Sequence, residues 1–104
     1  MNRFKVRIPN HVQDEITRQM LYIAQDSVDS AMRWEDRIRA AIMGLAEFHG
    51  HAVDDEASRR SGIVVHKLVF EKTYLVYYHV DNRANAVDVV GFRHGARLPH
   101  VDER

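Results

Sequence analysis

The spacing of hydrophobic and polar residues changes several times along this chain, and each change predicts a different element. Residues 4–8, FKVRI, alternate apolar and basic side chains, and this period of two predicts an opening strand. Pro9 ends the strand, because proline has no N–H to donate to a sheet. After Pro9 the apolar spacing lengthens to three and four residues, which predicts helices.

Two amphipathic helices are expected between residues 10 and 45. We expect Asn10 to be the N-cap of the first, with Gln13 completing a capping box, and Ser27 to be the N-cap of the second. The link between them is short, which favours an antiparallel helical hairpin. The apolar stripes are Val12, Ile16, Met20, Ile23 and Ala24 in the first helix, and Ala31, Trp34, Ile38, Ala41, Ile42 and Leu45 in the second.

The second half of the chain predicts a sheet. Residues 49–62, HGHAVDDEASRRSG, lack periodicity, and we expect a polar surface loop there. Strands are expected at about 63–70, 73–80 and 86–93, separated by the turns EK and DNRAN, which favours an antiparallel meander. The chain is thus expected to form one α+β domain, residues 1–104, with the order β-α-α-β-β-β.

The turns assign the strand residues to two faces of the sheet, at the risk of a one-residue slip that would invert a strand. The core face is expected to carry Val65, Lys67, Val69, Val76, Tyr78, Val80, Val90 and Phe92. The opposite face is expected to carry His66, Leu68, Leu75, Tyr77, His79, Val89 and Arg93. This second face mixes apolar, imidazole and cationic groups, and exposed apolar area of that kind usually marks a partner or a ligand groove.

The composition of the chain limits the classes of function and site that it can have. Fifteen basic and fifteen acidic side chains cancel, which argues against strong non-specific nucleic-acid binding. Cysteine is absent, so disulfides and thiolate metal sites are excluded. The chain begins without the apolar run of a signal peptide and contains no stretch of membrane-spanning length, so we expect a cytoplasmic protein.

Histidines are the most visible candidates for chemistry. His49 and His51 flank a glycine, but two imidazoles do not complete a zinc site, and we expect neither metal nor cofactor. His66 and His79 are expected near Tyr77, where imidazole and phenol groups can support acid–base chemistry. The alternative is that each histidine simply lies at the sheet surface and bonds to water.

Three segments together resemble the toxins of the ParE/RelE superfamily. They are the second helix SVDSAMRWEDRIRAAIMGL, the central strand TYLVYYHVD, and the last strand AVDVVGFRHGARLP with its terminal His-Gly-Ala-Arg motif. The resemblance covers nearly the whole chain. It implies a helical hairpin packed on a small twisted antiparallel sheet, and a type II toxin–antitoxin module that inhibits growth and acts in plasmid stabilisation.

The resemblance also implies partners. A cognate antitoxin would wrap the toxin in a hetero-oligomer, and Leu68, Leu75 and Tyr77 on the mixed face are the expected partner-binding residues. ParE-like members poison DNA gyrase, whereas RelE-like members cut mRNA on the ribosome. Here Leu75 and Gly95 occupy positions where the nucleases often hold arginine. Losing one such cation costs about 3 kcal/mol of transition-state stabilisation.

We therefore expect a gyrase inhibitor that acts by binding, with no enzymatic step. Its target-binding residues are Arg93, His94, Arg97 and His100. The alternative is a ribosome-dependent endoribonuclease whose catalytic residues are His66, His79, Arg93 and Arg97. A second alternative is a toxin-fold protein that has lost toxicity and serves only as a binding partner.

Overall fold

The computed structural model describes residues 3–95. The elements are β1 (Lys5–Arg7), α1 (Asn10–Ala24), α2 (Val28–Met43), a short 3-10 helix (Gly44–Ala46), α3 (Asp55–Ser61), β2 (His66–Phe70), β3 (Tyr74–Asp81) and β4 (Ala86–His94). The expected α+β fold and the order β-α-α-β-β-β are confirmed, with α3 as an addition.

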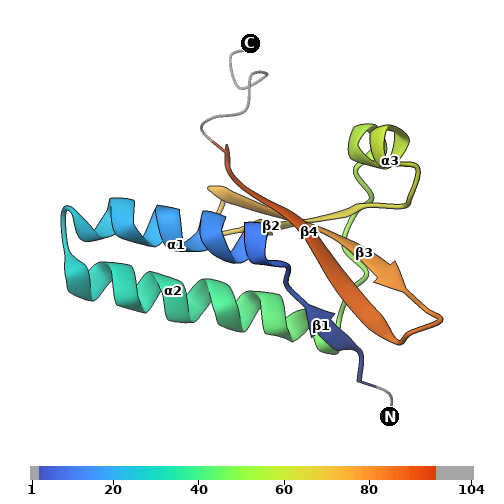
Figure 1. The fold of residues 1–104 in the computed structure, drawn as a ribbon, viewed down its shortest axis with the longest axis horizontal. Coiled ribbons are helices and arrows are strands. Elements are labelled where there is room, and N and C mark those ends of the chain that lie inside the picture. The colour runs from blue at the N-terminus through green and yellow to red at the C-terminus, as the bar shows by residue number, and fades with distance from the viewer. Residues whose placement is uncertain (1–2, 96–104) are drawn as a thin grey trace.

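The four strands form one sheet in the order β1-β4-β3-β2. The meander β2-β3-β4 is antiparallel as expected, but β1 pairs parallel with β4, so the sheet is mixed. A parallel pair needs a long connection, and residues 8–85, which include the α1–α2 hairpin, separate β1 from β4. Figure 1 shows that hairpin on one side of the sheet, with α3 standing apart from it.

The core lies between the helical hairpin and one face of the sheet. Val12 and Ile16 of α1 and Trp34, Ile38 and Ile42 of α2 are almost completely buried, which confirms both helical stripes. Each such aliphatic side chain contributes roughly 1.5–3 kcal/mol by leaving water. The hairpin is therefore fixed to the sheet by its apolar faces.

Helix α2 begins as expected, whereas α1 does not. The Ser27 hydroxyl accepts a hydrogen bond from the backbone N–H of Ser30 at 3.1 Å, which confirms the N-cap of α2. The expected Asn10 cap is wrong, because Pro9 occupies the N-cap position and its carbonyl accepts the first helical bonds. The Gln13 side chain instead accepts a hydrogen bond from Arg39 of α2 at 2.9 Å.

The expected loop 49–62 contains a helix, α3. The Asp54 carboxylate caps it by accepting from the N–H of Ala57 at 2.9 Å, and Gly62 ends it with a φ of 80°. The charges of α3 complement the helix dipole, with acidic residues in the first turn and Arg59 and Arg60 in the last turn. None of the residues of α3 is buried, so the helix carries no apolar period.

The face assignment of β2 is wrong by one residue. Phe70 pairs with Tyr74, so the turn has three residues instead of two, with left-handed φ values at Glu71 and Lys72. Because side chains alternate, the slip exchanges the faces of the whole strand. His66 and Leu68 therefore lie on the core face, and Lys67 and Val69 lie on the outer face.

Strand β4 is also partly inverted, by a bulge. Tyr77 pairs with Gly91 and Tyr78 with Val89, so Val90 is the extra residue. Val89 is consequently in the core, where Val90 was expected, and Val90 is partly exposed. Phe92 and Arg93, on the other side of the bulge, keep their expected faces.

Candidate functional site: a groove beside the end of β4

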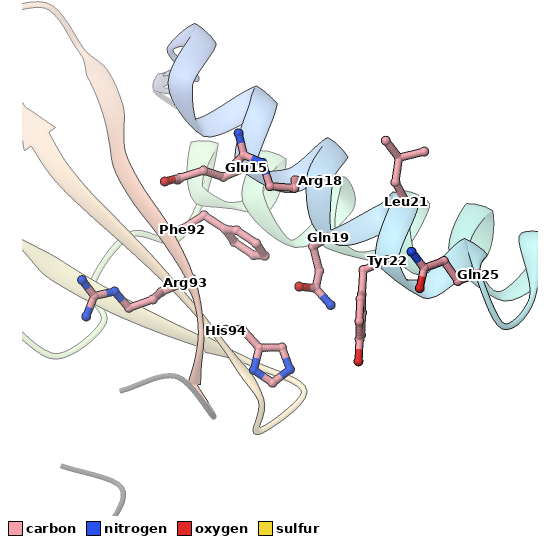
Figure 2. A pocket seen from close by; sticks show the side chains of 9 residues that line it. All are labelled: Glu15, Arg18, Gln19, Leu21, Tyr22, Gln25, Phe92, Arg93 and His94. Atoms are coloured by element: carbon pink, nitrogen blue, oxygen red, sulfur yellow. The ribbon is translucent and has the colours of Figure 1, made fainter. Parts of the chain in front are cut away.

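A groove of about 740 Å³ lies between α1 and the last residues of β4. Figure 2 shows Phe92 and His94 pointing from β4 toward α1, while Arg93 points away from it. The wall on the α1 side includes Leu21 and Tyr22, two large side chains that remain mostly exposed. The lining residues are Glu15, Arg18, Gln19, Leu21, Tyr22, Gln25, Phe92, Arg93 and His94.

The floor of the groove is formed by Phe92 and Gln19, which pack into an aromatic cluster beneath it. Tyr74 stacks on Phe92 with ring centroids 5.7 Å apart, and Trp34 packs against both rings. Gln19 is buried, and its amide nitrogen donates a hydrogen bond to the Tyr74 hydroxyl at 3.3 Å. Because these rings also belong to the core, the floor is rigid and the exposed wall around Tyr22 is the part able to adapt to a ligand.

The rim of the groove carries unneutralised positive charge. Arg18 and Arg93 are exposed and form no ion pair within residues 3–95. Glu15 is the lining carboxylate, and one of its oxygens is buried without a hydrogen-bond partner in the described chain. An apolar wall with cations on its rim suits an amphipathic acidic segment better than a basic one.

Arg93 connects the groove with the outer face of the sheet. It pairs across the strands with Leu75, and Tyr77 pairs in the same way with Gly91, on whose Cα a Cβ would lie 3.5 Å from the Tyr77 ring. Burial raises the pKa of Tyr77, and Asp54 raises it further, while Arg93 acts in the opposite direction. Leu75, Tyr77 and Arg93 therefore share the outer face, as the sequence predicted.

Leu68 does not belong to this surface. It packs against the core from β2, opposite Val76, so its expected place on the mixed face is wrong. Val69 takes the outer position instead and is about half exposed. The cause is the three-residue turn between β2 and β3, which the sequence does not distinguish from a two-residue turn.

The two strand histidines lie on opposite faces of the sheet. His66 stacks on the buried ring of Tyr78 at 5.1 Å, on the core side, whereas His79 lies on the outer face opposite Asp88. Each ring donates its Nδ1–H to a backbone carbonyl, His66 to His51 at 2.7 Å and His79 to Val64 at 2.8 Å. His66, His79 and Arg93 therefore do not form a single cluster.

The end of β4 is closely packed against the turn that precedes β3. His94 pairs with Tyr74, and its ring meets the Tyr74 ring edge-on at 5.0 Å. The next residue, Gly95, donates its N–H to the Thr73 carbonyl, and a Cβ at Gly95 would lie 2.7 Å from that oxygen. The remaining expected target-binding residues, Arg97 and His100, lie outside the described residues.

Residues 3–95 contain no group of three or more side chains placed to hold a metal ion. Within the same part of the chain, no helix combines the length and apolar character needed to cross a bilayer.

The groove contains residues that the sequence pattern did not single out. Gln19 interrupts the apolar stripe of α1, and a buried glutamine is visible in a sequence only as a polar residue at a core-facing position. Arg18 and Tyr22 flank it on the same helix. The sequence feature that could have revealed them is their spacing. At helical periodicity, positions 15, 18, 19 and 22 lie along one side of α1.

The comparison with known proteins agrees with this architecture. Residues 6–99 match the family described as the ParE toxin of the type II toxin–antitoxin system, parDE. No curated protein matches the chain. The family match extends from β1 through the end of β4 and so includes the helical hairpin, the sheet and the groove. The chain therefore belongs to the ParE toxin family of type II toxin–antitoxin systems.

Proposed function

We propose that this toxin inhibits DNA gyrase and is neutralised by a cognate antitoxin that occupies the groove between α1 and β4. The observation that carries the proposal is Arg93, in a chain of the ParE family: it is exposed at the end of β4 and has no ion-pair partner among residues 3–95. Arg93 and His94 would contact the target, and so would Arg97 and His100, which follow them in the sequence. The antitoxin would reach this surface from the adjoining groove.

A supercoiling assay with purified gyrase and purified toxin tests the target. Arg93→Glu reverses an exposed charge and is expected to abolish inhibition. The matched control is Arg59→Glu, an equal charge reversal on the exposed surface of α3, which should leave inhibition intact. If the unchanged protein does not inhibit gyrase at micromolar concentration, gyrase is not the target.

Antitoxin binding is tested separately by co-purification with the product of the adjacent reading frame. Tyr22→Ser removes an aromatic side chain from the groove wall, and Phe48→Ser removes one of equal exposure, 61% in both cases, away from the groove. Aromatic residues dominate binding energy at interfaces, so we expect Tyr22→Ser to weaken the complex at least tenfold, about 1.4 kcal/mol. Equal effects of the two substitutions would argue against the groove.

The endoribonuclease alternative has less support from the geometry. Its four candidate residues include His66 and His79, which lie on opposite faces of the sheet and both donate to carbonyls. The residue opposite Arg93 is Leu75, which is apolar. A phosphate bound there would need a second cation at that position. New 5′ ends detected by primer extension on translated mRNA would support the endoribonuclease hypothesis.

Loss of toxicity is the third hypothesis. Expression of the chain without its antitoxin should arrest growth if the toxin is active. Unchanged growth, with soluble protein present, would instead favour a toxin-fold protein that serves only as a binding partner.

A further inference from the structure

The segment 51–54 lies along the edge strand β2 and covers the first part of that strand. Lys67 donates its N–H to the Ala52 carbonyl at 2.9 Å, and Asp54 donates its N–H to the Val65 carbonyl at 2.8 Å. Val53 forms an isolated antiparallel bridge with His66. This short pairing covers a sheet edge that would otherwise be open to another strand.

One side chain in the segment is tied to the buried core. The hydroxyl of Tyr78, a fully buried residue, lies 2.8 Å from Nδ1 of His51 and 3.1 Å from its backbone N–H. A phenol oxygen accepts from the backbone N–H, so its single proton is available for Nδ1. His51 then carries its own proton on Nε2 and is neutral.

The other two imidazoles in this region, His66 and His79, act as donors through Nδ1, whereas Nδ1 of His51 acts as an acceptor. His66 donates Nδ1–H to the His51 carbonyl, and His79 donates Nδ1–H to the Val64 carbonyl. Protonation adds a hydrogen to Nε2 of these two rings and leaves both bonds in place. Protonation of His51 adds a hydrogen to Nδ1, the atom that accepts from Tyr78, and leaves the buried phenol proton without that acceptor.

We propose that His51 is a pH-sensitive latch, which when neutral holds segment 51–54 on the edge of β2 and when protonated releases it. The inference is independent of the toxin's target. It predicts that mild acid uncovers the backbone around His66 and Lys67, at the start of β2, while the helical hairpin stays folded.

The surroundings of His51 favour its neutral form. Burial lowers the pKa of His51, and the neighbouring His66 lowers it further. Phe48 packs edge-on against the ring and contributes no charge. Asp54, in the same segment, forms an ion pair with Lys67 at 3.7 Å, and these two charges oppose one another.

The sign of the linkage follows from the lowered pKa. The open segment binds a proton near the ordinary histidine pKa of about 6.5, and the closed segment binds it only at lower pH. Closure is therefore fully favoured above about pH 6.5 and weakens as the pH falls below it. One proton changes the opening equilibrium by at most about tenfold per pH unit.

Amide hydrogen exchange between pH 7.5 and 5.5, corrected for the intrinsic rate, tests the latch. We expect the protection of the Asp54 and Lys67 amides to fall with pH in the unchanged protein. His51→Asn keeps an acceptor near Tyr78 and removes the titration, so protection should become independent of pH. His79→Asn, which removes a histidine from the outer face, should keep the original slope, and protected amides of α2 confirm that each variant is folded.

A second measurement does not depend on any variant. Nitrogen chemical shifts of the imidazoles at pH 7.5 should report the Nε2–H tautomer for His51 and the less common Nδ1–H tautomer for His66 and His79. An Nδ1–H tautomer at His51, or the same pH slope in wild type and His51→Asn, overturns the proposal.

Discussion

Gly95 offers the sharpest test of how the end of β4 is built. A Cβ at this position would lie 2.7 Å from the Thr73 carbonyl oxygen and 3.5 Å from its carbonyl carbon. The obstacle is backbone in a tight turn, so it cannot move aside as a flexible side chain would. Gly95→Ala must therefore displace either the end of β4 or the turn before β3.

The expected penalty is that of an overpacked site. Adding carbon atoms where the structure has no space costs about 1–3 kcal/mol. For a domain of this size each kcal/mol shifts the melting temperature by roughly 4–8 °C, so Gly95→Ala should lower it by about 5–20 °C. The bond from the Gly95 N–H to the Thr73 carbonyl would lengthen or break, which should appear as faster exchange of the Gly95 amide.

Gly44→Ala is the matched control. A Cβ at Gly44 meets nothing within 4 Å, and the residue has an ordinary helical φ of −63°. The substitution should be neutral or stabilise the protein by about 0.4–1 kcal/mol. If Gly95→Ala melts within 1 °C of the unchanged protein while Gly44→Ala behaves as expected, the close approach at Thr73 does not constrain this position.

Four further substitutions test the helix caps, the packing and the charges. Ser27→Ala should cost about 1 kcal/mol in urea unfolding because it removes the cap of α2, whereas Asn10→Ala should be nearly neutral because Asn10 makes no capping bond. Trp34→Ala should cost about 3–5 kcal/mol by leaving a cavity beneath the groove, measured in the same way. The hydrogen bond from Arg7 lowers the pKa of Asp88, so stability that is present above about pH 4 should be lost on acidification, and Arg7→Ala should reduce that loss.

The sequence predicted the helical hairpin well because two long apolar stripes leave little freedom. Trp34, Ile38 and Ile42 repeat at helical spacing, and Ser27 begins the second helix with a hydroxyl suited to capping. The meander was also predictable, since its turns separate short β-branched runs. Helix α3 was not, because it buries no side chain and so has no apolar period, although Asp54 and Gly62 mark its two ends.

The candidate site was less accessible to sequence analysis, because strand faces depend on single residues. The third turn residue Thr73 reverses β2 and the extra residue Val90 reverses part of β4, and neither leaves a pattern in the sequence. Leu68 was misplaced for this reason. The groove was missed because Gln19, which forms part of its floor, is polar. Its burial depends on a hydrogen bond to the hydroxyl of Tyr74, which lies far away in the sequence, on β3.

The two positions that separate this chain from the nuclease pattern have structural explanations. At Gly95 there is no room for a Cβ beside the Thr73 carbonyl, so an arginine there would require a different path for the chain. At Leu75 the cross-strand neighbours are Val69 and Arg93, which form one row on the outer face. A guanidinium at position 75 would lie directly opposite that of Arg93, and like charges in that arrangement repel unless an anion lies between them. A sheet that holds no phosphate is more stable with leucine at this position, which is what a toxin acting by binding alone would require.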